Sequence, residues 1–336
     1  MSRRVRVGLL VLLAMLAGSG RAAGVAGEAG EGQARPRLAY LVSDLRIPFW
    51  DILWRGIRSR AEGLGYRVQV YSANNGAQRE LEHAVKVIRG GVDGIIVSPT
   101  NSSACATILK FARQGGIPAV IADVGTDGGA FVSYISSDNS DGAYRIGKVL
   151  TRRMHALGWG DGRVGIIAIP QTRENGRART VGFMKALDEA GIRGAGIRQQ
   201  VDFSYQETYR YAMELIRDDP GLRAVWLQGS DRYQAALDAI ADSGRRGEVL
   251  LVSFDAEPVF LDLIPAGQLV GAAMQQPYLM GEEAVSAMDR HLRGLEVERE
   301  VRLPILAISA ENIDQQLPII RRNVLGIEQR RGQPGR

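Results

Sequence analysis

From Arg37 onward, short apolar runs alternate with amphipathic stretches of helical length, and this alternation restricts the fold more than any other feature. The predicted strands are 38–42, 68–71, 94–98, 119–122, 132–135, 164–169, 197–202, 224–227, 249–254, 269–274 and 303–308. The predicted helices are 49–63, 79–89, 104–114, 143–156, 179–189, 206–217, 234–241 and 280–292. The strands are apolar along nearly their whole length, as in sheets covered on both faces. This pattern predicts parallel sheets connected by right-handed crossovers.

The number of strands is high for one small open sheet, and the pattern restarts near Gly162. We therefore expect an α/β protein with two doubly wound, Rossmann-like lobes. No low-complexity linker separates the two halves, so we expect short crossing segments between the lobes rather than a flexible tether.

The amino terminus has the composition of a targeting segment. Three arginines precede the apolar run 7–17, and small residues follow at 18–20 and 22–23. This order is typical of a secretory signal peptide. A membrane anchor is the alternative, but spanning a bilayer takes roughly 20 apolar residues. We therefore predict a cleaved signal peptide at 1–26, followed by a disordered leader at 27–36.

Charge and composition exclude several classes of protein. Beyond residue 26 the chain has 38 basic and 37 acidic residues, a net charge of +1, which does not fit a nucleic-acid partner. The single Cys105 rules out an intrachain disulfide, and three scattered histidines make a metal centre unexpected. The stretch 142–149 has phosphate-loop spacing, but Val149 stands where a hydroxyl should bind the metal. We expect no cofactor, no metal and no enzymatic activity.

Polar and aromatic side chains gather where the predicted strands end. Ligands of open α/β sheets bind beyond the carboxyl ends of the strands. The residues expected there are Ser43, Asp44, Phe49, Trp50, Asp123, Phe203, Gln228, Gly229, Ser230, Asp231, Asp255, Gln275 and Gln276, with an arginine-rich turn of Arg173, Arg177 and Arg179. Carboxylates accept hydrogen bonds from hydroxyls, arginines donate them, and aromatic faces cover apolar ring faces. The set predicts a site for a small hydroxylated molecule.

Structural interpretations of the same residues remain open. Asp255 also suits the N-cap of a helix that begins near Glu257. Phe49 or Trp50 also suits core packing, and Asp123 also suits an ordinary loop.

Eight stretches together resemble a known family. They are SDLRIPFW (43–50), GVDGIIVSPT (91–100), GIPAVIAD (116–123), SSDN (136–139), RARTVGF (177–183), AVWLQ (224–228), VSFD (252–255) and QQP (275–277). In order and spacing they resemble the periplasmic sugar-binding proteins of the ribose-binding type, whose type I fold is shared with the ligand-binding halves of LacI-type repressors. The resemblance runs from about Leu38 to Ile308.

The resemblance implies two lobes joined by a three-segment hinge. The first lobe is expected to comprise 37–137 and 277–301, and the second 138–276 and 302–336. The tail beyond Ser309 is expected to pack on the second lobe. The family also implies a monomer that is located in the periplasm and closes around its ligand.

The resemblance further implies which residues bind the ligand. They are Phe49, Trp50, Asp123, Arg179, Phe203, Asp255 and Gln275. The first two match an aromatic pair that sandwiches a sugar ring, and Phe203 matches the aromatic residue of the second lobe. The acids come one from each lobe, the arginine lies in the cleft, and the glutamine lies near the hinge.

Three positions depart from the family pattern. Ile47 stands where the family often has Asn, Val124 where an Arg usually follows the acid, and Gly229 where an Asn binds hydroxyls. The ligand is then less hydroxylated than a standard pentose, or other residues such as Arg46, Asp44 and Asp231 replace the lost contacts.

Two functions fit this resemblance. The first is capture of a solute for delivery to an inner-membrane ABC permease. The alternative is a ligand sensor that signals occupancy to a membrane histidine kinase. The chain has no helix-turn-helix, and its predicted export signal also excludes a LacI-type regulator.

Overall fold

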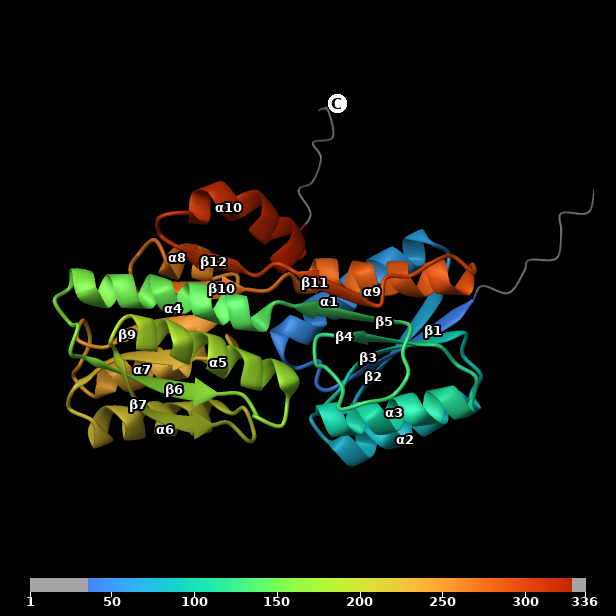
Figure 1. Ribbon diagram of the computed structural model, residues 1–336, viewed down its shortest axis with the longest axis horizontal. Coiled ribbons are helices and arrows are strands. Elements are labelled where there is room, and N and C mark those ends of the chain that lie inside the picture. The colour runs from blue at the N-terminus through green and yellow to red at the C-terminus, as the bar shows by residue number, and fades with distance from the viewer. Residues whose placement is uncertain (1–35, 328–336) are drawn as a thin grey trace, which may run out of the picture. The chain divides into compact units, whose positions relative to one another are not determined.

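The computed structural model describes residues 36–327 (Figure 1). The predicted signal peptide and all of the predicted leader except Pro36 lie outside the described residues. No helix of the described part is long and apolar enough to cross a membrane.

The first lobe is built on a six-stranded, fully parallel sheet with the order β11-β5-β4-β3-β1-β2. Its strands are β1 (Arg37–Val42), β2 (Arg67–Ser72), β3 (Gly94–Ser98), β4 (Ala119–Ala122), β5 (Ser133–Ser137) and β11 (Glu300–Leu303). Every one of these strands overlaps a predicted run, and the predicted fold class is confirmed.

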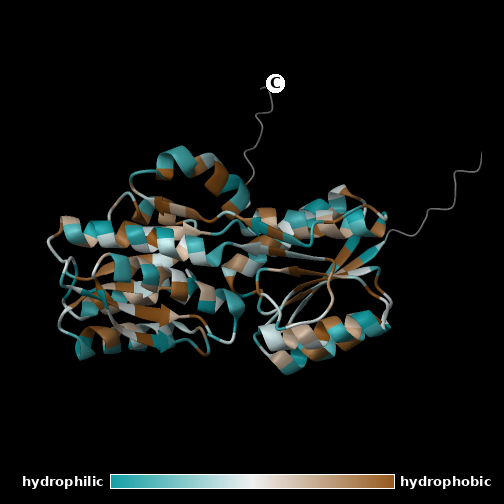
Figure 2. Cartoon of the chain, viewed as in Figure 1, coloured by the Kyte–Doolittle hydropathy of each residue, from teal (hydrophilic) through white to brown (hydrophobic). Residues whose placement is uncertain are grey.

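Helices cover both faces of this sheet, as Figure 1 shows. They are α1 (Pro48–Gly63), α2 (Ala77–Arg89), α3 (Ser102–Gln114) and α9 (Pro277–Leu292). Successive side chains of β1 point to opposite faces. Tyr40 packs in the core under α1 and α9, whereas Leu41 packs in the core under α2 and α3. Burial on both faces explains why the strands read as continuous apolar runs (Figure 2).

The second lobe repeats this plan with the strand order β12-β10-β9-β8-β6-β7. The strands are β6 (Arg163–Ala168), β7 (Arg193–Gln199), β8 (Leu222–Leu227), β9 (Leu250–Phe254), β10 (Gly271–Met274) and the antiparallel β12 (Leu306–Ser309). The helices are α4 (Asn139–Ala156), α5 (Glu174–Glu189), α6 (Tyr205–Asp218), α7 (Tyr233–Asp242), α8 (Phe260–Leu263) and α10 (Ile313–Ile319), followed by the π-helical turn η1 (Ile320–Val324). The core under α4 and α5 is separate from the core that holds α6, α7, α8 and the C-terminal turns.

The chain crosses between the sheets three times. The crossings lie between β5 and α4, between β10 and α9, and between β11 and β12. The predicted single strand 303–308 is wrong. It is two strands in two different sheets, because Pro304 has no N–H to continue a ladder.

The C-terminal segment packs on the second lobe and also contacts the first. Ile320 and Val324 are buried in the second-lobe core. Arg55 of α1 donates to the carbonyl of Leu325 at 3.0 Å, and Arg322 pairs with Glu282 of α9 at 2.8 Å.

Helices α1 and α9 pack closely because each has a glycine at the contact. A Cβ on Gly281 would overlap the carbonyl oxygen of Leu53, and a Cβ on Gly56 would overlap that of Tyr278. We expect Gly281→Ala to lower the free energy of unfolding by about 1–3 kcal/mol, because the helices must separate. The matched control is Gly63→Ala in α1, whose Cβ would meet nothing within 4 Å. Equal unfolding midpoints in urea for the two variants would contradict this account.

Candidate functional site

The seven residues predicted to bind ligand line one cavity between the lobes. The cavity is also lined by Ile47, Ile169, Arg173, Asn175, Gly229, Ser230 and Asp231. Its volume is about 40 Å³, space for roughly three water molecules. Of the three positions that depart from the family pattern, Ile47 and Gly229 line this cavity, whereas Val124 is buried in the first-lobe core.

Unusual backbone conformations direct three of these side chains into the cavity. Asp123 follows β4 directly and has a φ of 72°, and Asp255 follows β9 with a φ of 66°. Phe203 has a φ of 56°. Residues other than glycine seldom adopt positive φ, and when they do they concentrate at ligand sites. The left-handed turn at each position therefore supports a binding role over that of an ordinary loop residue.

The start of α1 forms the first-lobe wall. Pro48 is the first helical residue, where its missing N–H costs nothing, so Phe49 and Trp50 lie in the first turn. The Trp50 Nε1 donates to Asp123 Oδ2 at 3.3 Å. Both rings also belong to the buried core of the lobe, so the packing interpretation and the cavity-lining interpretation hold together.

Arg179 organises the second-lobe wall. Its Nε donates to Asn139 Oδ1 at 2.8 Å, and its Nη1 donates to the carbonyl of Gln228 at 2.7 Å. The same Nη1 lies 3.6 Å from Asp255 Oδ2, and the guanidinium packs 3.9 Å from the centroid of the Phe254 ring. Arg179 is 3% exposed, so these contacts hold its charge out of water.

Asp255 does not cap a helix. The next helix, α8, begins at Phe260 with Val259 at its N-cap, so the capping interpretation is wrong. Instead, Asp255 Oδ1 accepts a hydrogen bond from Gln275 Nε2 at 2.6 Å. The acid and the amide thus form one unit beside the second crossing.

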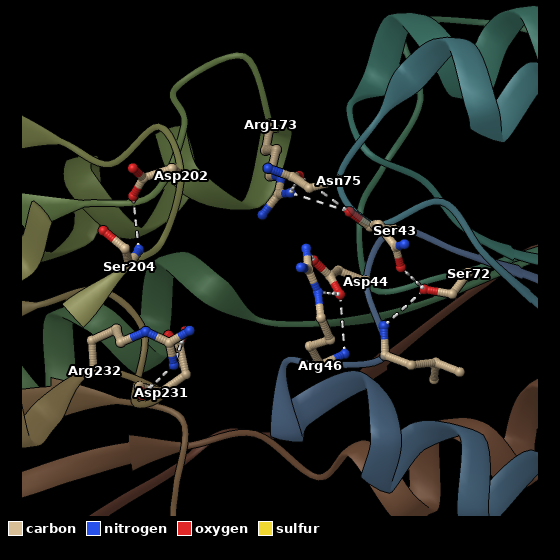
Figure 3. Close-up of polar contacts among 12 residues, drawn as sticks. Ser43, Asp44, Arg46, Ser72, Asn75, Arg173, Asp202, Ser204, Asp231 and Arg232 are labelled. Carbon is tan, nitrogen blue, oxygen red and sulfur yellow. Dashed lines mark hydrogen bonds and ion pairs between the residues drawn. The ribbon is translucent and has the colours of Figure 1, made fainter. Parts of the chain in front are cut away.

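The N-terminus of α5 reaches from the second lobe to the first. Arg173 Nε donates to the carbonyl of Thr100 at 3.0 Å, and its Nη2 lies 3.3 Å from Asn75 Oδ1 (Figure 3). Asn175 Nδ2 donates to Asp123 Oδ1 at 3.3 Å. Sequence reasoning named Arg173 only as part of an arginine-rich turn and did not name Asn175. The one available signal was that both precede Arg179 within two turns of the same helix.

Two ion pairs face each other across the cleft in Figure 3. Arg46 pairs with Asp44 at 2.6 Å on the first lobe, and Arg232 pairs with Asp231 at 3.3 Å on the second. The Arg46 side chain is 70% exposed, so this pair contributes little to stability. Arg46, Asp44 and Asp231 were the residues expected to replace the lost ligand contacts. Of these, Asp231 lines the cavity, whereas Asp44 and Arg46 are paired with each other and are not among the lining residues.

Three buried acceptor atoms of the cavity wall receive no hydrogen bond within residues 36–327. Among the described residues, the buried atoms Asn175 Oδ1, Asp231 Oδ2 and Gln275 Oε1 accept no hydrogen bond, although Asp231 Oδ2 is ion-paired with Arg232 at 3.3 Å. Both amides give their NH₂ groups to carboxylates, which fixes the orientation of their oxygens. Buried polar atoms are rarely left unpaired. The cavity is therefore suited to a molecule that brings several hydrogen-bond donors.

Burial also raises the pKa of the acids. It raises the pKa of Asp123 to about 6 and that of Asp231 to about 6, in both cases mainly by desolvation. Burial lowers the pKa of Arg173 to about 10. No group of three or more metal-ligating side chains comes together within residues 36–327.

These pKa values predict how ligand affinity depends on pH. Hydroxyl groups that donate to a carboxylate favour its ionised form, so the bound state has lower acid pKa values than the free state. Binding then releases protons, and we expect the dissociation constant to rise as the pH falls from 7 to 5. Calorimetry in two buffers of different ionisation enthalpy measures the proton release. An Asp123→Asn variant should show a smaller pH dependence, and a flat wild-type profile would contradict the assignment.

Comparison with known proteins identifies relatives that cover most of this chain. The sequence profile of the family described as periplasmic binding protein domain matches residues 38–296. The ribose import binding protein of Bacillus subtilis (strain 168) is 28% identical over 267 residues, which is 79% of this chain and 84% of that protein. The ribose import binding protein of Escherichia coli (strain K12) is 28% identical over 270 residues, covering 79% of this chain and 88% of that protein.

Solved structures share the fold. A carbohydrate transporter solute-binding protein from Agrobacterium radiobacter, in complex with D-arabinose, has a TM-score of 0.80 at 22% identity and covers 87% of this chain and 99% of its own. A solute-binding protein from Bacillus halodurans with bound myo-inositol has a TM-score of 0.76 at 19% identity and covers 86% of this chain and 100% of its own. With the profile match over most of its length, the chain belongs to the periplasmic binding protein domain family.

Proposed function

We propose that this protein captures a neutral, sugar-like molecule in the cleft between its lobes and delivers it to an inner-membrane ABC importer. The observation that carries the proposal is the set of three buried acceptors around the cavity that receive no hydrogen bond from the described part of the chain. A molecule with several hydroxyl groups satisfies them. The cavity's acids Asp123, Asp255 and Asp231 are matched by Arg173, Arg179 and Arg232, so a strongly charged ligand is unfavourable.

The relatives support this function. They are named as import binding proteins for ribose, and the structural neighbours are solute-binding proteins of transporters. The chain is accordingly a binding protein and not an enzyme. The sensor alternative has no such support.

We assign ligand contact to the seven residues predicted from the sequence. Trp50 and Phe203 cover the ligand's apolar faces, while Asp123 and Asp255 accept from its hydroxyls. Arg179 donates to a ligand oxygen, and the remaining contacts come from Phe49 and Gln275.

The remaining parts of the proposal concern the whole protein. The signal peptide is removed at about residue 26, and the mature protein is a periplasmic monomer without a nucleic-acid partner. Its lobes comprise 37–137 with 277–301 and 138–276 with 302–336. They close on the ligand about the three crossings, as binding proteins of this architecture do. The permease contacts both lobes, because only then does it distinguish the closed from the open form.

The test is calorimetric titration of the mature protein with neutral pentoses, hexoses and cyclic polyols, with Trp50 fluorescence as a second signal. At least one should bind with a micromolar or lower dissociation constant. Asp255→Ala should weaken that binding at least roughly tenfold, because it removes a buried charged hydrogen-bond partner. Asp188→Ala, an exposed acid on α5, is the matched control. Binding of none of these sugars, or equal affinity in Asp255→Ala, would refute the proposal.

A transport assay separates the two cellular roles. Deleting the gene should abolish uptake of the radiolabelled ligand, and the intact gene should restore it. Unchanged uptake together with a lost transcriptional response would instead favour the sensor.

A further inference from the structure

The guanidinium of Arg173 lies against both aromatic walls of the cavity. Its central carbon is 5.2 Å from the centroid of the Trp50 ring and 5.4 Å from that of the Phe203 ring, within the range of cation–π contacts. These are the two rings proposed above to cover the faces of the ligand. A flat group of the protein itself therefore already makes the contact that each ring would offer to a sugar.

The space left beside Arg173 is too small for a sugar. The cavity volume is about 40 Å³, and Arg173 is 4% exposed. This volume holds roughly three water molecules, whereas a pentose has about ten non-hydrogen atoms. The structure thus shows the site in a state that excludes the proposed ligand. A sugar can enter only after Arg173 and the rings have separated.

Groups of the first lobe hold the guanidinium in this place. Arg173 is the N-cap residue of α5 in the second lobe, but its Nε donates to the carbonyl of Thr100 at 3.0 Å. Its Nη2 lies 3.3 Å from Asn75 Oδ1 and 3.5 Å from Ser43 Oγ (Figure 3). Thr100 is fixed in turn by Glu80, whose carboxylate accepts from the Thr100 N–H at 2.9 Å. The side chain thus ties the two lobes together without any ligand.

The next two residues of the chain strengthen this tie. The N–H of Glu174 donates to Ser102 Oγ at 3.3 Å, and Asn175 Nδ2 donates to Asp123 Oδ1 at 3.3 Å. Three consecutive residues at the start of α5 therefore bond to the first lobe. Every partner in these contacts belongs to the protein, so the lobes can close without a bound sugar.

This closed arrangement leaves part of the cavity wall unsatisfied. While Arg173 lies on the rings, Asn175 Oδ1, Asp231 Oδ2 and Gln275 Oε1 receive no hydrogen bond from residues 36–327. A ligand with several hydroxyl groups would donate to these atoms, which Arg173 does not do. A ligand shifts an equilibrium by its differential affinity for the two states. The acceptors supply such a difference, with which a sugar can displace Arg173.

We propose that Arg173 is an internal competitor of the ligand: in the unliganded protein it takes the ligand's place on the two rings and closes the cleft. We call this the self-closed state. The inference rests on the proposed function. Because self-closed molecules cannot bind, the apparent dissociation constant is the intrinsic one divided by the fraction of binding-competent molecules. Removing the Arg173 side chain should therefore tighten binding, whereas removing a ligand contact would weaken it.

A distance measurement without ligand tests the self-closed state. Gln78→Cys in α2 and Asp188→Cys in α5 place spin labels at exposed positions of the two lobes, while the native Cys105 is buried. In double electron–electron resonance, the unliganded protein should give mainly one short distance, with the lobes closed. Arg173→Ala should move most unliganded molecules to a longer distance, because the lobes lose this tie.

Calorimetric titration measures the competition itself. The neutral pentoses, hexoses and cyclic polyols are titrated into the wild type and into Arg173→Ala. For the one that binds best, the dissociation constant of Arg173→Ala should be at least about tenfold lower, which corresponds to a self-closed fraction of about 90% or more in the wild type. Arg177→Ala is the matched control. It removes an exposed arginine of the same helix that bonds to the carbonyl of Gln171, and it should change neither distance nor affinity.

Asn75→Gly is a second variant, which leaves Arg173 in place. It removes one acceptor from Nη2, and glycine readily adopts the φ of 62° found at this position. Distance and affinity should both shift in the same direction as in Arg173→Ala, but by less. If Arg173→Ala does not fold, Asn75→Gly decides, and unchanged values in it overturn the inference.

The remaining outcomes are also decisive. Lobes that lie apart in the unliganded wild type, or that stay equally closed in Arg173→Ala, overturn the inference and leave the proposed function intact. Unchanged or weaker sugar binding by Arg173→Ala also overturns it, and weaker binding would make Arg173 a ligand contact. Binding of no sugar or polyol by either protein refutes the proposed function, while the distances measured without ligand still decide whether Arg173 closes the cleft.

Discussion

An Arg179→Ala protein is expected to lose about 3–5 kcal/mol of its free energy of unfolding, the typical cost of breaking a buried charge pair. The side chain is 3% exposed and bonds to Asn139 and to the Gln228 carbonyl. Its removal leaves both groups without a donor and leaves Asp255 without its nearest positive charge. Burial already raises the pKa of Asp255, and the loss of Arg179 would raise it further. A protonated Asp255 is a weaker acceptor for hydroxyls, so ligand affinity should also fall, by roughly tenfold to a hundredfold.

Urea denaturation of the unliganded protein and calorimetric titration measure the two effects separately. Arg177→Ala, on the same helix and exposed, should change neither quantity appreciably. Arg179→Lys should recover only part of both losses, because one ammonium group cannot reproduce the planar fork that bonds two acceptors and stacks on Phe254. An Arg179→Ala protein as stable and as tight-binding as the Arg177 control would remove Arg179 from the site.

A second large effect is expected at Trp226, in the core under α4 and α5. Its ring is fully buried and stacks on Phe183 with centroids 3.8 Å apart and planes 14° apart. Trp226→Ala should lower the free energy of unfolding by about 3–5 kcal/mol, through lost burial and the cavity left behind.

A second variant, Trp226→Phe, separates the effect of losing the ring from the effect of losing the indole N–H. The buried Nε1 of Trp226 has no hydrogen-bond partner among the described residues, and an unpaired buried donor carries a cost. Phenylalanine keeps the stacked ring and removes that donor, so its loss of stability should be much smaller. Thermal unfolding curves of both variants measure the two losses, and similar losses would contradict this account, because they would show that a phenyl ring does not replace the indole in this stack.

The central strands β1, β3 and β4 of the first lobe were predictable because burial on both faces demands apolar runs. The strand β7 shows where this signal weakens. It begins at Arg193, four residues before the predicted start, and its first residues include Gly194 and Gly196. It lies at the edge of its sheet and is largely half-buried or exposed, so it lacks the composition of a covered strand.

Some residues of the cavity wall could be placed from the neighbouring sequence, whereas others depend on contacts with residues far away in the chain. Residues such as Asp123 and Asp255 were predictable because a strand end fixes their position by itself. Arg173 was named only as part of an arginine-rich turn, and its contacts were not predictable, because its partners Thr100 and Ser43 lie 73 and 130 residues away in the chain. Only the packing of the two lobes against each other shows that this side chain lines the cavity rather than extending into solvent.

The third crossing also determines when the protein can fold during its synthesis. β11 forms one edge of the first sheet and β12 one edge of the second, and both lie within residues 300–309. One face of the first sheet is covered only after α9 has been made, because α9 packs on α1 through its glycine contact and contributes to the core on that face. A nascent chain that has not passed Glu300 therefore has two incomplete lobes rather than one finished and one unfinished. Neither half can therefore complete its sheet ahead of the other, and the two lobes finish folding together.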